Sequence, residues 1–224
     1  MTKKIHYDTI LKNGKAVLPD GIMEVDIAIN NESISTIGNL SDCSADNIID
    51  CSGLHILPGV IDSQVHFREP GLENKENLES GMLAAAAGGV VAVFEMPNTS
   101  PLTITPETIE DKLSRASRVA WTDYAFYLGG TGRTGPNLGK WENAPGICGI
   151  KIFMGASTGD LLAASDEEVA SVLSNGNRVV AVHAEDQYIM EENMKTILGD
   201  SHDVSLHCKW RSPESCLSAT KRVV

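Results

Sequence analysis

The feature that most constrains the fold is an alternation of apolar segments and helix signals that begins at Pro58. Five apolar segments have the length of β-strands, and helical stretches separate them: residues 60–66, 90–96, 123–128, 149–154 and 178–183. Such alternation is typical of βαβ units, in which helices connect parallel strands. The sequence therefore predicts a parallel sheet covered by helices from residue 58 onward.

Capping residues mark where the connecting helices begin. Thr105 precedes Pro106, which combines an N-cap with proline at the first helical position. Ser165 and Glu168 have the spacing of a capping box. Ser212-Pro213 predicts the start of a further helix near the end of the sequence.

The first 57 residues have the pattern of β-structure instead. Segments 7–11 and 16–18 flank Asn13-Gly14, a pair that favours a β-hairpin. Asn30-Asn31 predicts another turn, before a strand at 33–37. We expect a small β-sandwich portion at residues 1–57 and an α/β portion at residues 58–224.

The number of strand units decides between a closed barrel and a partial one. A complete (β/α)₈ barrel needs about 250 residues, and only five units fit after residue 58. An open five-stranded sheet would leave unpaired edges. The predicted fold is α/β, an incomplete (β/α)₈ TIM-type barrel with about five of eight strands preceded by a small β-sandwich unit. We expect the chain to be the N-terminal portion of a longer protein.

Charge and composition limit the kinds of molecule that the chain is expected to bind. The net charge is −12, and such a field repels nucleic acid and anionic membranes. No run of about 18 apolar residues occurs that could cross a bilayer. The five cysteines form no CxxC pair, which favours reduced thiols and a cytoplasmic location. A small-molecule substrate is the expected partner.

Polar side chains lie at the ends of four predicted strands. His66 and Arg68 follow the first strand, Asn98 follows the second, Lys151 lies in the fourth and His183 ends the fifth. The carboxyl ends of parallel barrel strands converge on one face, where active sites lie. Two histidines and a lysine from different strands can build a divalent metal site.

The segment Pro58–Gly71, the Met-Pro-Asn-Thr motif at 96–99, and the segments around Lys151 and His183 together resemble the amidohydrolase superfamily, most closely the dihydroorotases. The resemblance covers the whole chain. It implies that His66 and His183 are metal ligands, and that Lys151 is a carboxylated lysine bridging two metals. It also implies that Arg68 and Asn98 hold the substrate carboxylate.

The resemblance implies a zinc enzyme with one or two ions. Its reaction would interconvert dihydroorotate and N-carbamoyl-aspartate in pyrimidine biosynthesis. Gln64 stands where the family has its first histidine ligand, and an amide oxygen is a weaker zinc ligand than an imidazole. The family's next ligand and its general base lie on later strands, so this chain would hold only part of the site. Barrel amidohydrolases often associate, so a homo-oligomer is expected.

Two alternatives remain open at this point. Some dihydroorotase-like chains have lost metal ligands and serve as structural partners of aspartate transcarbamoylase, and Gln64 allows this interpretation. A hydantoinase or allantoinase type of cyclic amidase would keep the chemistry and change the substrate. Each candidate residue alone also has an ordinary explanation, such as a solvated lysine for Lys151 or a surface ion-pair cluster for Arg68.

Overall fold

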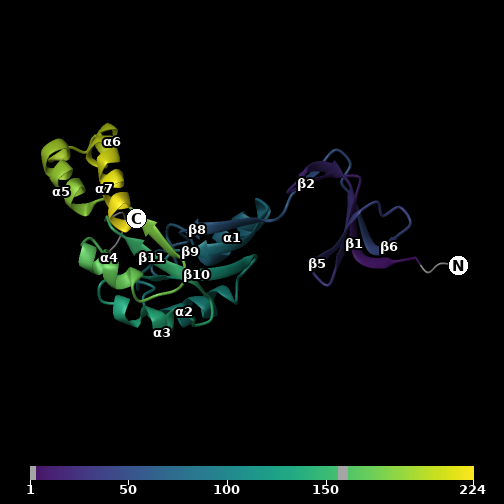
Figure 1. Cartoon of the computed structure of the whole chain (residues 1–224), viewed down its shortest axis with the longest axis horizontal. Coiled ribbons are helices and arrows are strands. Elements are labelled where there is room, and N and C mark those ends of the chain that lie inside the picture. Colours follow the sequence, from purple (N-terminus) through teal and green to yellow (C-terminus); the bar gives the residue numbers. More distant parts are fainter. Residues whose placement is uncertain (1–3, 156–160) are drawn as a thin grey trace. The chain divides into compact units, whose positions relative to one another are not determined.

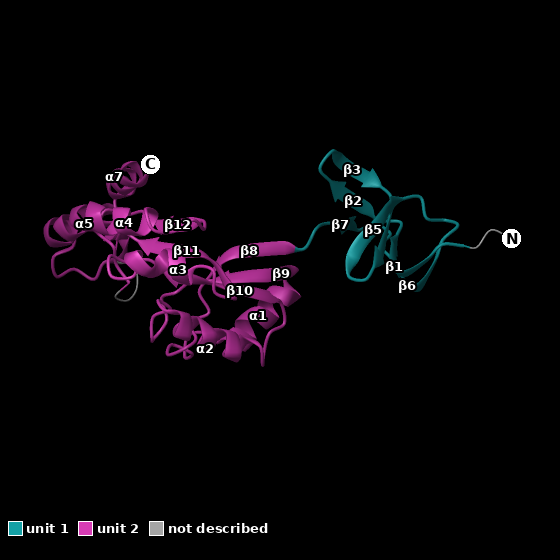
Figure 2. Cartoon of the chain, turned by 60° about the horizontal axis from the view of Figure 1, so that its bottom comes forward, with its two compact units in different colours: residues 1–59 teal, residues 60–224 magenta. Residues whose placement is uncertain are grey.

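A computed structural model describes residues 4–155 and 161–224. The chain divides into two compact units, residues 1–59 and residues 60–224 (Figure 2). The strands of the first unit are β1 (His6–Lys12), β2 (Lys15–Leu18), β3 (Gly21–Glu24), β4 (Asp26–Asn30), β5 (Ser33–Gly38), β6 (Ser44–Asp50) and β7 (His55–Ile56).

These strands form two separate sheets, one with the order β5-β4-β1-β6 and one with the order β3-β2-β7. The turn predicted at Asn30-Asn31 is confirmed, because β4 and β5 pair as antiparallel neighbours across it. The hairpin predicted at Asn13-Gly14 is wrong, because β1 and β2 belong to different sheets. The physical reason is that β1 already pairs with β4 on one side and β6 on the other, so neither of its edges is open to β2.

The second unit alternates strands and helices. Its strands are β8 (Val60–Val65), β9 (Val90–Glu95), β10 (Asp123–Gly129), β11 (Ile147–Phe153) and β12 (Val180–His183). Its helices are α1 (Leu78–Ala87), α2 (Pro106–Ala116), α3 (Leu138–Trp141), α4 (Asp166–Leu173), α5 (Gln187–Asn193), α6 (His207–Trp210) and α7 (Pro213–Val223). Short 3₁₀ turns at Gly135–Asn137 and Val204–Leu206 and a π-helical turn at Met194–Leu198 complete it.

The five strands of this unit form one parallel sheet with the order β12-β11-β10-β9-β8 (Figure 1). Sequential strands lie side by side, as they do in a (β/α) barrel. The expected α/β sheet, with about five of the eight barrel strands, is therefore confirmed. The helix starts are confirmed too: Thr105 accepts from Thr108 N at the start of α2, and Ser165 and Glu168 form the capping box of α4.

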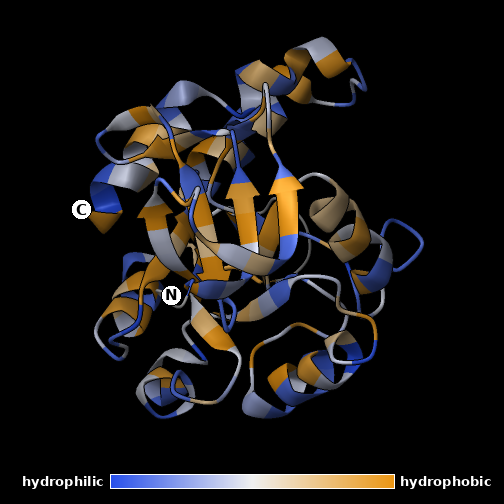
Figure 3. Cartoon of the chain, turned by 90° about the vertical axis from the view of Figure 1, so that its right-hand side faces the viewer, coloured by the Kyte–Doolittle hydropathy of each residue, from blue (hydrophilic) through white to orange (hydrophobic). Residues whose placement is uncertain are grey.

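The core of the second unit lies between the sheet and its helices. Val93, Phe126 and Ile150 from three strands pack with Met82 of α1 and Ile109 of α2, all of them buried. In Figure 3, several strands carry long apolar stretches, whereas helices and loops alternate apolar and polar residues. This packing holds the carboxyl ends of β8 to β12 at one edge of the sheet. Over the described ranges, no helix is both long and apolar enough to cross a membrane.

Candidate active site

His66 and Asn98, which follow β8 and β9, are in direct contact. Nδ1 of His66 lies 2.8 Å from Oδ1 of Asn98. An amide oxygen only accepts, so Nδ1 carries the proton and donates it. Asn98 is buried and His66 is half-buried. The hydrogen bond therefore orients the imidazole and leaves Nε2 as its basic nitrogen.

The loops that follow β8 and β9 are joined by their backbones. Met96 N donates to Val65 O at 3.0 Å, and Ser100 N donates to Pro70 O at 2.9 Å. Gly71 has a φ of +90°, and a Cβ there would lie 2.0 Å from Ser100 O. Only glycine fits both the left-handed conformation and this close approach.

Phe67 lies between His66 and Arg68 in sequence and anchors this loop to α1. Its ring is 6% exposed and belongs to the same core as Leu78 and Met82. A Cβ on Gly81 of α1 would lie 2.4 Å from Cδ1 of the ring. The missing side chain at Gly81 is thus what allows Phe67 to pack onto the helix.

Arg68 is held in an unusual backbone conformation. Its φ is +65°, in the left-handed region that non-glycine residues rarely adopt. The side chain is half-buried, and in residues 4–155 and 161–224 its guanidinium forms no hydrogen bond or ion pair. Its charge nevertheless acts on His66, because it helps to lower the pKa of that imidazole. Arg68 therefore offers an uncommitted cation beside His66.

Lys151 lies inside β11 and is 2% exposed. Its Nζ is 4.9 Å from the centre of the Phe153 ring, a cation–π distance. Burial lowers the pKa of the Lys151 amine. The neutral amine, which is the nucleophilic form, is thereby favoured relative to an exposed lysine.

His183 ends β12 and belongs to a charged network. Its Nε2 lies 2.5 Å from Oε2 of Glu185, and the Nε of Arg211 donates to Oε1 of the same carboxylate at 3.0 Å. A second guanidinium nitrogen of Arg211 contacts Oε2, so the pair is bidentate. Burial opposes ionisation of Glu185, but the bonds from Arg211 and His183 outweigh it and hold the pKa of Glu185 below its ordinary value. The ring centres of His183 and Phe153 are 5.9 Å apart, and Phe153 is also the ring that Nζ of Lys151 approaches.

Burial lowers the pKa of His66, and the charges of Arg68, Lys151 and Lys112 act in the same direction, although the bond to Asn98 opposes them. The neutral imidazole is therefore the favoured form near pH 7, and it is the form that binds metals.

The sequence-predicted residues fall into two groups in space. His66 and Asn98 are hydrogen-bonded, and the charges of Arg68 and Lys151 reach His66. His183 belongs to the Glu185 network. Gln64 is exposed on β8, and its backbone N–H donates to Oδ1 of Asp62 at 3.0 Å.

His66 and His183 supply the kind of donor that a divalent metal takes. His66 and His183 each have one ring nitrogen held by a polar side chain, the arrangement by which proteins orient metal-binding imidazoles. Across the described residues, no group of three or more His, Cys, Asp and Glu side chains lies close enough to hold a metal. Lys151 would have to supply the third donor, as the resemblance implies.

Sequence reasoning missed a buried ion pair beneath this region. Glu95, at the end of β9, pairs with Lys112 of α2, and each side chain is 1% exposed. The signal was present in the sequence, because Lys112 shares the apolar face of α2 with Ile109 and Ala116 at helical spacing. Arg211 was also missed as a partner of Glu185.

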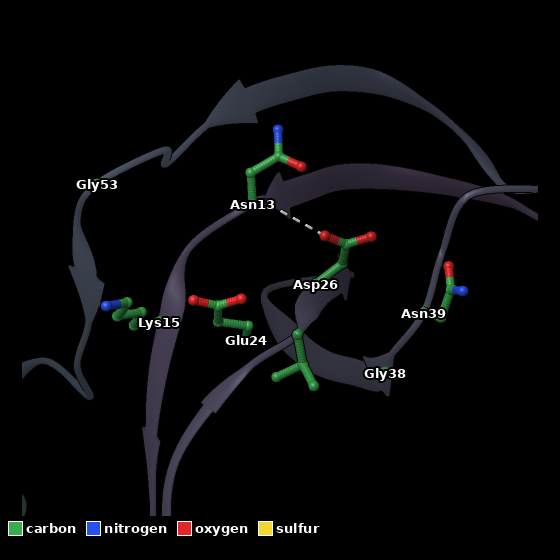
Figure 4. Close-up of a pocket in the computed structure, with 8 residues that line it drawn as sticks. Asn13, Lys15, Glu24, Asp26, Gly38, Asn39 and Gly53 are labelled. Atoms are coloured by element: carbon green, nitrogen blue, oxygen red, sulfur yellow. Dashed lines mark hydrogen bonds between the residues drawn. The ribbon is translucent and has the colours of Figure 1, made fainter.

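A polar hollow of about 480 Å³ in the first unit is a separate feature (Figure 4). Of the two carboxylates that line it, Glu24 and Asp26, Asp26 accepts the backbone N–H groups of Asn13 at 3.1 Å and Leu40 at 3.2 Å. These bonds occupy both carboxylate oxygens in holding turns together. We therefore interpret the hollow as structural.

Comparison with known proteins shows which proteins the chain is similar to. A family model described as "Dihydro-orotase-like" matches residues 53–131. An allantoinase of Desulfitobacterium hafniense is 38% identical over 194 residues, covering 84% of this chain and 42% of the relative. A dihydroorotase of Halobacterium salinarum is 34% identical over 212 residues, covering 93% of this chain and 48% of the relative.

Solved structures show the same fold. The L-hydantoinase (dihydropyrimidinase) of Arthrobacter aurescens matches with a TM-score of 0.89 and 30% identity, covering 96% of this chain and 49% of that one. The chain thus spans about half the length of the curated relatives and of this solved structure.

Proposed function

Because this chain belongs to the amidohydrolase superfamily, we propose that the full-length protein hydrolyses a cyclic amide bond in a small molecule. The substrate we propose is dihydroorotate, interconverted with N-carbamoyl-aspartate as a step of pyrimidine biosynthesis. The observation that carries this choice is the uncommitted guanidinium of Arg68 beside His66.

Dihydroorotate carries a carboxylate next to its ring, and a guanidinium binds a carboxylate through two parallel hydrogen bonds. Arg68 is half-buried, which strengthens such a contact relative to one in open water. An arginine held in a strained left-handed conformation and paired with nothing in the described chain has no evident structural task. Binding an anionic substrate accounts for its position.

In this proposal His66, His183 and a carboxylated Lys151 would hold one or two zinc ions, and the exposed Gln64 would offer only a neutral amide oxygen. Zinc, when bound, polarises a carbonyl oxygen and lowers the pKa of water. Arg68 and Asn98 hold the substrate carboxylate and so set the orientation of the ring. Asn98 keeps the proton on Nδ1 of His66. Burial favours the neutral amine of Lys151, the form that takes up carbon dioxide.

The test compares Arg68→Ala and Arg68→Lys in the full-length, zinc-loaded protein. Charge-assisted hydrogen bonds contribute about 1.5–3 kcal/mol, so Arg68→Ala should lower kcat/KM for dihydroorotate roughly 10- to 100-fold. Lysine keeps the positive charge but cannot form two parallel hydrogen bonds to a carboxylate, so Arg68→Lys should retain part of the kcat/KM that Arg68→Ala loses. The exposed Arg133 serves as a matched control, and Arg133→Ala should leave the kinetics unchanged.

Unchanged kinetics for Arg68→Ala would contradict the assignment of dihydroorotate. A folded full-length protein that takes up no zinc and turns over no cyclic amide would instead favour a non-catalytic partner of aspartate transcarbamoylase.

A second candidate is a neutral cyclic amide of the hydantoin or allantoin type. It is favoured by the identity to an allantoinase and by the structural match to an L-hydantoinase. Parallel assays with dihydroorotate and with an uncharged hydantoin separate the two. Faster turnover of the hydantoin, insensitive to Arg68→Ala, would establish the second candidate.

A further inference from the structure

The ion pair between Glu95 and Lys112 lies directly beneath the turn that carries Asn98. Glu95 ends β9, and the turn Met96-Pro97-Asn98 follows at once. Nζ of Lys112 bonds to Oε2 of Glu95 and also donates to the backbone oxygen of Met96 at 3.2 Å. A single ammonium group therefore connects α2 to the turn, two residues before the amide that holds His66.

Burying this ion pair costs desolvation free energy, which suggests that the pair has a role other than stabilising the fold. Both residues are fully buried. Burial raises the pKa of Glu95 to about 7 and lowers the pKa of Lys112, although each charge supports the other. Within the described part of the chain, Oε1 of Glu95 has no hydrogen-bond partner. Buried ion pairs are weak stabilisers, and apolar residues of similar volume often replace them without loss.

The rest of the turn is held from other sides. Thr103 N donates to Pro97 O at 2.9 Å, and Met96 N donates to β8. In the described chain, Lys112 is the side chain that bonds the Met96 carbonyl. This bond restrains rotation of the Met96–Pro97 peptide, which immediately precedes Asn98.

We propose that Lys112 is a positioning residue, which fixes the Met96–Asn98 turn so that the Asn98 amide oxygen accepts the Nδ1 proton of His66. Glu95 acts one step further away, by holding the ammonium group of Lys112. The inference deepens the proposed function, because it names what orients one candidate metal ligand. It concerns the tautomer of His66, which exists whether or not the protein turns over dihydroorotate.

The experiment measures the His66 tautomer by ¹⁵N NMR in the full-length protein after zinc has been removed with a chelator. His66 is assigned by the resonance missing from His66→Asn. The wild type should show predominantly the Nδ1–H tautomer. Lys112→Met should reduce that preference roughly three- to tenfold, the equilibrium worth of an ordinary hydrogen bond.

Lys112→Met leaves Glu95 buried and unpaired, so a double variant separates positioning from stability. Glu95→Leu with Lys112→Met removes both charges and should restore the fold, but the Met96 carbonyl still lacks its donor. Positioning predicts that the double variant regains the wild-type midpoint of unfolding and still loses the tautomer preference. Two control variants should retain the Nδ1–H tautomer preference of His66. They are Glu95→Gln, which keeps Lys112 in place, and Lys140→Met on the exposed face of α3.

A double variant that folds with a wild-type His66 tautomer would overturn the proposal, because the Thr103 and β8 bonds would then suffice. A second measurement uses zinc affinity by chelator competition. Loss of a partner that bonds a metal ligand directly typically weakens metal binding about 10- to 100-fold. Because Lys112 acts through Asn98, the double variant should bind zinc more weakly than the wild type by up to about tenfold. A wild type with the Nδ1–H tautomer but no turnover of dihydroorotate would defeat the proposed substrate and leave this inference standing.

Discussion

The contact between Gly81 and Phe67 yields a prediction with two opposing contributions. In Gly81→Ala the new Cβ would lie 2.4 Å from Cδ1 and 2.6 Å from Cε1 of the ring. Carbon atoms in favourable contact are about 3.5–4.0 Å apart, so the ring would have to move by about 1 Å or more. Phe67 is 6% exposed within a packed core, which leaves it little room.

The sizes of the two contributions decide whether Gly81→Ala stabilises or destabilises the protein. Alanine in a helix interior is favoured over glycine by about 0.8–1 kcal/mol. Forcing an extra carbon into a packed core costs about 1–3 kcal/mol. The expected net effect of Gly81→Ala is a loss of about 1 kcal/mol in the free energy of unfolding. When Phe67→Leu removes the ring, only the helix contribution remains, and Gly81→Ala should then stabilise by about 1 kcal/mol.

Urea unfolding of the wild type, both single variants and the double variant gives the coupling energy directly. Ser80→Ala at the neighbouring exposed position is the control for helix propensity and should change stability by only a few tenths of a kcal/mol. If Gly81→Ala stabilised the protein equally with and without the Phe67 ring, the argument from close packing would be refuted.

Three further outcomes follow from the structure. Asp186 accepts from the hydroxyl of Ser218 at 2.7 Å, caps α5 and accepts from Arg222 at 3.2 Å. Burial opposes its ionisation, but these bonds hold its pKa below the ordinary value, so its contribution is present at neutral pH and is lost as pH falls through the folded pKa. Asp186→Ala should cost about 1–2 kcal/mol at pH 7 and progressively less as the pH falls below about 4, measured by unfolding across pH. Ser165→Ala removes half of the α4 capping box and should cost about 1 kcal/mol in urea unfolding, whereas Ser165→Gly should cost only a few tenths. Burial raises the pKa of Cys148 to about 11, so mass spectrometry after iodoacetamide treatment at pH 8 should find the exposed Cys208 alkylated well before Cys148.

The local features of this fold could be predicted from the sequence. Thr105 and Ser165 act within one helical turn, so their capping roles follow from neighbouring residues alone. The apolar strands β8 to β12 could be located for the same reason, since alternation with helices is visible along the chain. The pairing of β1 could not, because it depends on β4 and β6, which lie at very different distances along the chain.

In the candidate site, too, the sequence predicts which residues stand at strand ends but not which distant residues they contact. His66, Asn98, Lys151 and His183 could be proposed because each stands at or near a strand end, where parallel topology brings side chains together. Their actual partners depend on the loops. The bond between His66 and Asn98 joins residues that are 32 positions apart, and no local pattern predicts it.

The bond between Ser100 N and Pro70 O, with Gly71 pressed against it, has a consequence for protein engineering. The loops that follow β8 and β9 are far apart in the sequence, but their backbones are bonded to each other and form one structural unit. Exchanging the segment after β8 for that of a relative would bring a foreign backbone against Ser100 unless the segment after β9 were exchanged with it. Substrate range in this part of the protein should therefore be transplantable only as a matched pair of loops.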